Sequence, residues 1–176
     1  MSKPSLYSIH CEKYYKWYLK NEEYFRADER RIKALDAFKK LSTAAVYAAY
    51  LVLLGYLVLK TDMRIIRVIL VPAAVFFITT IIRSSLNAPR PYEKYPIRSI
   101  LHKSTKGNSC PSRHTACAVG IAFACLYISI PAGIAMLILS ILIALSRLVM
   151  GVHFPLDVAF GFVLAAFISI VGFWVI

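Results

Sequence analysis

Residues 41–59 read LSTAAVYAAYLVLLGYLVL and contain no charged side chain. A helix of this length, at about 1.5 Å per residue, nearly covers the roughly 30 Å hydrocarbon core of a bilayer. Four more stretches are similarly apolar, at residues 65–82, 114–130, 132–150 and 157–176. Because these runs are long and continuous rather than short and alternating, they argue against β-strands. We therefore expect an all-α, integral membrane bundle of about five transmembrane helices over residues 41–176.

Charged residues are distributed unevenly along the chain. They make up 17% of the sequence, against about 25% in an average soluble domain, and 59% of the residues are hydrophobic. Residues 1–40 hold ten Lys/Arg and six Asp/Glu, whereas residues 114–176 hold only Arg147 and Asp157. This composition excludes a disordered chain and argues against a nucleic-acid-binding domain, despite a net charge of +12. It indicates a membrane protein with a basic head.

The head, residues 1–40, is predicted to be an amphipathic helical segment of a single-domain protein. One face of such a helix can lie among lipid headgroups. The alternative is a solvated helix that caps the bundle, and the sequence does not separate the two. The aromatic residues at roughly helical spacing are Tyr14, Trp17, Tyr18, Tyr24 and Phe25.

The four cysteines, Cys11, Cys110, Cys117 and Cys125, lack the paired spacing of a zinc site. We expect free thiols, and within an apolar helix a cysteine packs as a small hydrophobic residue. A disulfide that involves Cys110 is the alternative.

Ionisable residues beside the apolar stretches gather in three places. Such residues are costly to bury in a membrane and are functional candidates for that reason. One cluster lies in the loop after the second stretch, one at the end of the fourth, and one just before the fifth. Alternating spans would bring all three to the same membrane face. The members are Arg83, Arg90, Ser112, Arg113 and His114; Ser146 and Arg147; and His153 and Asp157.

These clusters combine several arginines and two histidines with very few carboxylates. Asp157 is the one acid among them, apart from Glu93 in the first loop. A cationic pocket of this kind fits a tetrahedral oxyanion such as phosphate. A metal site fits poorly, because hydrolytic metal centres need several carboxylate or histidine ligands. We therefore predict a phosphate site that uses no metal and no cofactor.

The spacing of these residues also suggests a chemical mechanism. Ser112 can cap the third span, so that its hydroxyl and the following amides face a bound anion. Pro155 suits a first helical turn, which puts Asp157 within reach of His153. A carboxylate on one imidazole nitrogen leaves the other nitrogen nucleophilic. Across the pocket, His114 is the candidate general acid.

Three segments resemble the signature motifs of the type-2 phosphatidate phosphatase superfamily, which also includes the vanadium haloperoxidases. The first is RSSLNAPRP at residues 83–91, and the second is PSRH at residues 111–114. The third is SR at 146–147, followed after five residues by His153 and after three more by Asp157. The motifs occur in order with their spacings intact. The resemblance implies a haloperoxidase-like helical core and a membrane phosphatase.

The resemblance also implies a role for each matching residue. By the family pattern His153 attacks phosphorus and forms a phosphohistidine, while Asp157 orients it. His114 would protonate the leaving group and later activate water. Arginine side chains would stabilise the phosphoryl oxygens in place of a metal ion. The residues that would bind phosphate are Arg83, Arg90, Arg147 and Ser112.

Two positions depart from the family pattern. Arg83 stands where lysine is usual. The positive charge is kept, but a planar guanidinium group replaces the compact ammonium group of lysine. Arg113 stands where glycine is usual, so an arginine must be tolerated where glycine would allow close backbone approach to phosphate. Arg113 could equally add a contact to a second phosphate or to a lipid headgroup.

Three classes of function fit these observations. The leading one is a phosphatase of phospholipid metabolism that hydrolyses a monoester or diphosphate of a membrane lipid. Phosphatidate, phosphatidylglycerophosphate, undecaprenyl diphosphate and lipid A phosphate all fit, and no residue separates them. The second class is a vanadate-dependent haloperoxidase-like enzyme, and the third is a non-enzymatic anion or lipid carrier. The lipid bilayer is the expected partner, nucleic acid is not, and the oligomeric state stays open.

The membrane face of the site has two conflicting predictions for a multi-pass protein of the cell membrane. The head and the long loop carry most of the lysines and arginines, against Lys60, Arg64 and Arg67 on the other side. The positive-inside rule therefore predicts a cytoplasmic site. The resemblance implies the opposite, because many family members work on the extracytoplasmic face. The loop charges interpreted as surface or headgroup charges are Lys94, Arg98, Lys103 and Lys106.

Overall fold

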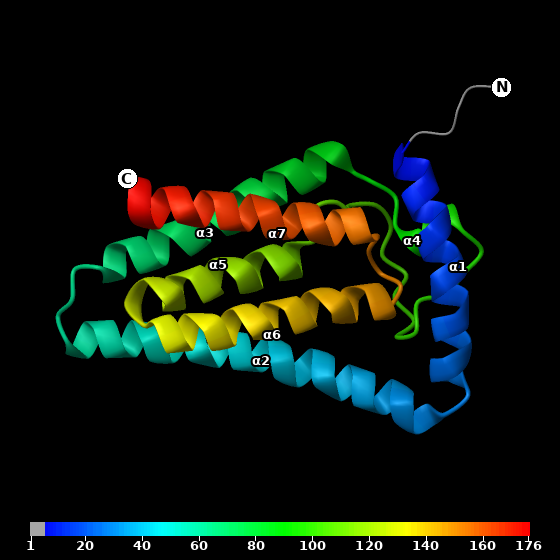
Figure 1. The fold of residues 1–176 in the computed structure, drawn as a ribbon, viewed down its shortest axis with the longest axis horizontal. Coiled ribbons are helices and arrows are strands. Elements are labelled where there is room, and N and C mark those ends of the chain that lie inside the picture. The colour runs from blue at the N-terminus through cyan, green and yellow to red at the C-terminus, as the bar shows by residue number, and fades with distance from the viewer. Residues whose placement is uncertain (1–5) are drawn as a thin grey trace.

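The computed structural model describes residues 6–176, and all the regular secondary structure of this part of the chain is helical, without a strand. Helices α2, α3, α5, α6 and α7 lie side by side, and α1 crosses one end of them (Figure 1). The prediction of an all-α helical bundle is confirmed. The elements are α1 (Leu6–Arg26), α2 (Glu29–Leu59), α3 (Ile65–Leu86), α4 (Pro91–Lys94), α5 (Arg113–Ile128), α6 (Ile130–Val149), α7 (Pro155–Ile170) and the terminal π-helix η1 (Val171–Val175).

Four of the described helices are long and apolar enough to cross a membrane, and these are α2, α3, α6 and α7. The predicted third stretch forms α5, which is apolar but has 16 residues and ends two residues earlier than expected. Nine of those residues are buried, because α3, α6 and α7 all pack against it. A single residue, Ser129, separates α5 from α6, so the two helices form a tight hairpin. The bundle is therefore built around a short central helix.

The basic head forms two helical pieces with a break after Arg26. Asp28 caps the second piece, because its carboxylate accepts a hydrogen bond from the Arg30 amide at 2.8 Å. The helix that begins there, α2, continues to Leu59, so the predicted boundary at residue 40 falls inside it. The part of the predicted head at residues 1–5 lies outside the described residues. The end of the charged segment near residue 40 therefore marks the start of the apolar part of α2, and the helix itself continues through it.

Helix α1 caps the bundle through its aromatic face. Tyr14 and Tyr18 are buried, and the ring of Tyr14 lies 5.6 Å from that of Phe154. The Tyr14 hydroxyl donates to the carbonyl of Leu148, and the Tyr18 hydroxyl donates to that of Arg98, each at 2.8 Å. These contacts favour the capping interpretation of the head. All four cysteines are free thiols, as predicted.

Candidate active site

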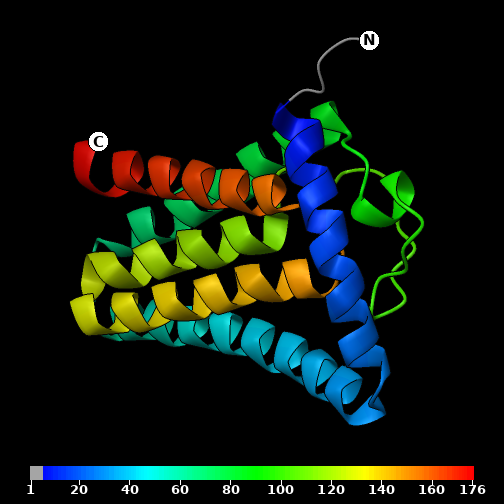
Figure 2. The same ribbon diagram turned by 45° about the vertical axis from the view of Figure 1, so that its right-hand side comes forward.

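All three predicted clusters lie at the end of the bundle that α1 covers (Figure 2). Arg83 is in the last turn of α3, Arg90 precedes α4, His114 is in the first turn of α5, and His153 lies between α6 and α7. Together with Arg113 they line a cavity of about 460 Å³. Five of the eight predicted site residues thus share one cationic cavity.

The beginnings of α5 and α7 touch, and this contact brings the second and third motifs together. The Ser112 amide donates to the Asp157 carbonyl at 2.9 Å. Gly161, one turn further along α7, allows this approach, because a Cβ atom there would lie 2.8 Å from the Ser112 carbonyl oxygen. The helix packing therefore fixes His114 near the loop that carries His153.

His153 is connected to Asp157 through a serine that the sequence analysis did not single out. Its Nδ1 is 3.9 Å from Asp157 Oδ2, which is too long for a hydrogen bond, but 3.3 Å from Ser109 Oγ. The Ser109 hydroxyl donates to Asp157 Oδ2, so its oxygen can accept a hydrogen bond from the Nδ1–H group of His153. This arrangement leaves Nε2 without a proton. Ser109 lies three residues before Ser112, but only the fold brings it to His153.

The imidazole of His153 is 2% exposed. Burial lowers its pKa to about 4, with the Asp157 carboxylate acting against the shift. The ring is therefore neutral around pH 7, which is the state in which an imidazole nitrogen can attack an electrophile.

Arg83 and Arg90 are held in place by backbone carbonyls around the cavity. Arg90 Nε donates to the Gly107 carbonyl at 3.0 Å, and Nη1 donates to the Val152 carbonyl at 3.2 Å. Arg83 Nη1 donates to the Pro111 carbonyl at 3.1 Å. Arg90 thus braces the loop that carries His153, and Arg83 braces the backbone just before the helix that carries His114. Fixed donors of this kind need little reorganisation to bind an oxyanion.

Arg147 does not line the cavity of His153, which differs from the predicted convergence. It lines a neighbouring cavity of about 400 Å³ together with Lys39, Lys40 and His114. Its side chain is buried, and neither Nε nor Nη2 has a hydrogen-bond partner among the described residues. Arg147 therefore presents two buried donors that the described protein leaves unsatisfied.

Ser112 and Arg113 occupy the start of α5. Ser112 is the residue before the helix, as predicted, but its buried hydroxyl accepts from Thr115 Oγ1 at 3.0 Å and is absent from the cavity lining. Arg113 has an ordinary helical backbone, so the usual family glycine is not required there. Its guanidinium carbon lies 5.7 Å from the centre of the Phe76 ring. The arginine thus faces both the cavity and the apolar interior.

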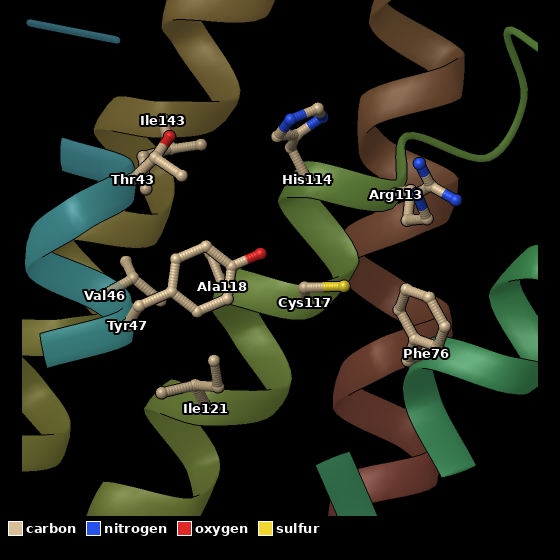
Figure 3. Close-up of a pocket in the computed structure, with 10 residues that line it drawn as sticks. All are labelled: Thr43, Val46, Tyr47, Phe76, Arg113, His114, Cys117, Ala118, Ile121 and Ile143. Carbon is tan, nitrogen blue, oxygen red and sulfur yellow. The ribbon is translucent and has the colours of Figure 1, made fainter. Parts of the chain in front are cut away.

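An apolar pocket of about 180 Å³ continues from the cavity into the bundle. Figure 3 shows His114 and Arg113 at one end of this pocket, with the rings of Tyr47 and Phe76 on opposite sides of Cys117. Arg113 and His114 line the polar cavity as well as the apolar pocket. The site therefore offers a cationic compartment joined to an apolar one.

Two loop lysines belong to the site although the sequence analysis interpreted them as surface charges. Lys103 and Lys106 line the same cavity as His153. The pKa of Lys103 is lowered to about 8, by burial first and by the nearby cations Arg90 and Arg147 next. Neither lysine lies within a motif, so their place could not be inferred from spacing. Within residues 6–176 the structure shows no group of three or more His, Cys, Asp or Glu residues that could hold a metal ion.

Comparison with known proteins gives concordant results. A model of the PAP2 superfamily matches residues 64–176. The bacitracin transport permease protein BcrC of Bacillus licheniformis is 28% identical over 136 residues, which cover 74% of this chain and 67% of that protein. The crystal structure of Aquifex aeolicus LpxE has a TM-score of 0.67 at 23% identity, over 85% of this chain and 92% of that one. A transmembrane PAP2-type phosphatidylglycerolphosphate phosphatase from Bacillus subtilis has a TM-score of 0.56 at 17% identity, over 92% and 93%.

Proposed function

The chain belongs to the PAP2 superfamily and is a multi-pass membrane phosphatase, and from this premise we propose that it hydrolyses a lipid phosphate through a phosphohistidine at His153. One observation carries the choice of a lipid. His114 and Arg113 line both the cationic cavity and the apolar pocket. A substrate that fills both compartments needs a phosphate group attached to an apolar chain.

The first chemical step transfers the phosphoryl group to the enzyme. Nε2 of His153 forms a bond to phosphorus while the bond from phosphorus to the leaving oxygen breaks. The phosphate anion bound beside His114 favours the protonated imidazolium form of this residue, which gives its extra proton to that oxygen. Asp157 acts on His153 through the Ser109 hydroxyl. Arg90 and the other cations of the cavity stabilise the charge on the phosphoryl oxygens.

The second step returns the enzyme to its starting state. Water attacks the phosphohistidine, His114 accepts a proton from the water, and the bond from Nε2 to phosphorus breaks. Inorganic phosphate leaves, and the dephosphorylated lipid remains in the bilayer. The cations that surround His153 supply the positive charge that a magnesium ion gives in many other phosphoryl-transfer enzymes. We therefore expect hydrolysis to continue when magnesium is chelated.

Phosphate release from a panel of lipids tests this proposal. The purified protein in detergent, with excess chelator, is given phosphatidate, phosphatidylglycerophosphate, undecaprenyl diphosphate and lipid A phosphate. We expect release from at least one of them, and a loss of roughly 10³-fold or more in His153→Ala, because the nucleophile is removed. Radiolabelled substrate should leave an acid-labile, base-stable phosphoprotein in the wild type alone.

His102 provides a matched control in the same long loop. It is exposed, does not line the cavity of His153, and has a φ of 51°, so His102→Asn keeps a residue that tolerates this backbone. We expect this variant to retain activity. Binding of the lipids without phosphate release would instead support a carrier, and halide oxidation that requires vanadate would support a haloperoxidase-like enzyme. Either result would overturn the proposed reaction.

A further inference from the structure

Lys103 lies in the long loop between α4 and α5, outside the three motif segments, and still lines the cavity of His153. It also lines a cavity of about 590 Å³ formed by α4 and the loop after it, together with Arg98 and Lys106. We call this the loop cavity. Lys103 thus borders the cavity of His153 and is also exposed at the surface.

The backbone of Lys103 is fixed by a buried serine. Ser99 Oγ accepts a hydrogen bond from the Lys103 amide at 2.5 Å and donates to the Lys103 carbonyl at 3.3 Å. The next residue after this serine, Ile100, is buried, and its amide donates to the Met150 carbonyl at 3.2 Å. Met150 belongs to the segment between α6 and α7 that also carries His153. The turn that carries Lys103 is therefore tied to the backbone of the active site.

Positive charge surrounds Lys103. Within residues 6–176 it forms no salt bridge with a carboxylate. Like charges at short distance repel one another, so an anion bound among them would stabilise the arrangement. Burial lowers the pKa of Lys103 first, and the neighbouring cations that lower it further are Arg90, Arg147, Arg83 and Lys39.

The second lysine of the cavity, Lys106, has a different environment. It lines the loop cavity together with Glu93, and its positive charge helps to lower the pKa of the Glu93 carboxyl group, after the hydrogen bonds from the Arg90 and Gly107 amides. A carboxylate therefore balances part of the charge of Lys106. Lys103 has no such partner, and this difference selects it as the lysine that lacks an anion.

We propose that Lys103 binds the phosphoryl group that His153 accepts, as a phosphate ligand that the loop supplies. This inference rests on the proposed function and adds to it a residue that lies in no motif. The arginines Arg83 and Arg90 are held by backbone carbonyls, so they offer donors in fixed positions. A lysine adds a compact charge on a flexible stem, which can follow the phosphoryl oxygens as the group is transferred.

The charge of Lys103 changes within a pH range in which the protein can be studied. With a pKa of about 8, the free side chain is mostly cationic around pH 7 and mostly neutral around pH 9.5. Its contribution to phosphate affinity is therefore present around pH 7 and is lost as the pH rises through about 8. This dependence distinguishes a direct phosphate contact from a purely structural role.

Other groups near Lys103 also carry charge or titrate, but they are common to the wild type and to variants of this lysine. The ratio of phosphate affinities between a variant and the wild type at one pH therefore isolates Lys103. On the helices these groups are Lys39, Arg83, Tyr92, Glu93, Arg113, His114, Arg147 and Asp157, and on the loops they are Arg90, Arg98, His102, Lys106 and His153.

Binding of inorganic phosphate to the purified protein in detergent tests this inference without turnover. Equilibrium dialysis with radiolabelled phosphate gives the Kd in the wild type and in Lys103→Met, which removes the charge and keeps an aliphatic stem. We expect Lys103→Met to raise the Kd about tenfold or more around pH 7, because a charge-assisted hydrogen bond is lost. Around pH 9.5 this difference should shrink several-fold. Lys103→Arg should bind like the wild type around pH 7 and more tightly than the wild type around pH 9.5, because a guanidinium keeps its charge.

Arg98→Gln is the matched control for the loss of one positive charge from this loop. Arg98 is exposed and lines the loop cavity but not the cavity of His153. We expect this variant to keep the wild-type Kd at both pH values. Equal effects of Arg98→Gln and Lys103→Met would overturn the inference, because they would show a general effect of loop charge.

The remaining outcomes separate this inference from the proposed function. An unchanged Kd in Lys103→Met, a difference that does not depend on pH, or no phosphate binding by the wild type overturns the role of Lys103. Failure of every lipid in the panel to release phosphate overturns the proposed function instead, and leaves Lys103 as a phosphate ligand. If Lys103→Met does not fold, the comparison of Lys103→Arg with the wild type around pH 9.5 still decides, because equal affinities there contradict the contact.

Discussion

Ser109 shows how one hydroxyl can decide the tautomer of the imidazole that we propose as the nucleophile. It is fully buried between His153 and Asp157, which are 44 and 48 residues further along the chain. A hydroxyl that donates to the carboxylate and accepts from Nδ1 fixes the neutral tautomer with Nε2 free. Ser109 is therefore a positioning residue for the proposed nucleophile rather than a group that touches substrate.

Replacing Ser109 by alanine should slow formation of the phosphohistidine. Outer-shell partners of this kind typically contribute 10- to 100-fold, so we expect kcat to fall at least about tenfold while KM changes little. Rapid-quench measurement of the radiolabelled phosphoprotein gives the rate directly, and thermal unfolding in detergent shows whether the fold is intact. Ser104→Ala is the control, because Ser104 is an exposed serine of the same loop that does not line the cavity. Equal rates in Ser109→Ala and wild type would exclude the relay.

At the level of single residues, motif spacing predicted much of the site. Arg83, Arg90, Arg113, His114 and His153 were all expected near bound phosphate and do line one cavity. What spacing could not give is contact between distant segments. The residues that it missed or assigned elsewhere reach the site only through helix packing: Ser109, Lys103, Lys106, Lys39 and Lys40.

At the level of elements, α1 supports the loop that carries His153. Tyr18 packs against Gly151, whose φ of 72° lies in the left-handed region. A Cβ atom on Gly151 would lie 2.4 Å from the Tyr18 ring, so glycine is needed both for the backbone angle and for the contact. The head thus stabilises the loop between α6 and α7 although it lies outside the segment that matches the family model.

Gly151→Ala should therefore destabilise the protein and impair the site together. Strain at a left-handed backbone costs about 1–3 kcal/mol, and displacement of Tyr18 adds to it. We expect a lower thermal unfolding temperature in detergent and reduced phosphate release. Gly55→Ala is the matched control, because Gly55 lies within α2, four residues before its end, and a Cβ atom there meets nothing within 4 Å. Equal effects of the two substitutions would contradict the support that we assign to α1.

Helix positions followed from the apolar runs, but helix ends did not. The hydrophobic stretch at 41–59 marks the apolar part of α2, whereas the helix begins at Glu29 because charged residues there are good helix formers with favourable pairs such as Glu29 and Lys33. Likewise α3 continues to Leu86, beyond the expected end at residue 82. Hydropathy predicts which part of a helix is surrounded by lipid, whereas capping and packing determine the residues at which the helix begins and ends.

At the scale of the whole molecule, the site and the head share one end of the bundle, and the turn between α2 and α3 lies at the other (Figure 1). Four of the lysines near the site line its cavities: Lys39, Lys40, Lys103 and Lys106. When these lysines and the motif arginines Arg83, Arg90 and Arg113 are left out, eight Lys/Arg remain in the head and two in the long loop, against three at the opposite end. The positive-inside rule still favours a cytoplasmic site when the lysines that line the cavities are left out of the count.

Cysteine labelling in intact cells tests this orientation from both ends of the molecule. In a variant without the four native cysteines, Ser104→Cys reports the site end, and Met63→Cys reports the opposite end, where Met63 is 75% exposed. A membrane-impermeant thiol reagent should label Met63→Cys in intact cells and Ser104→Cys only after permeabilisation. The reverse pattern would place the site outside the cytoplasm. In that case the positive-inside rule would not explain the lysines and arginines of the head and loop, because that rule would keep them in the cytoplasm. Contacts with anionic substrate and lipid headgroups would then have to explain these charges.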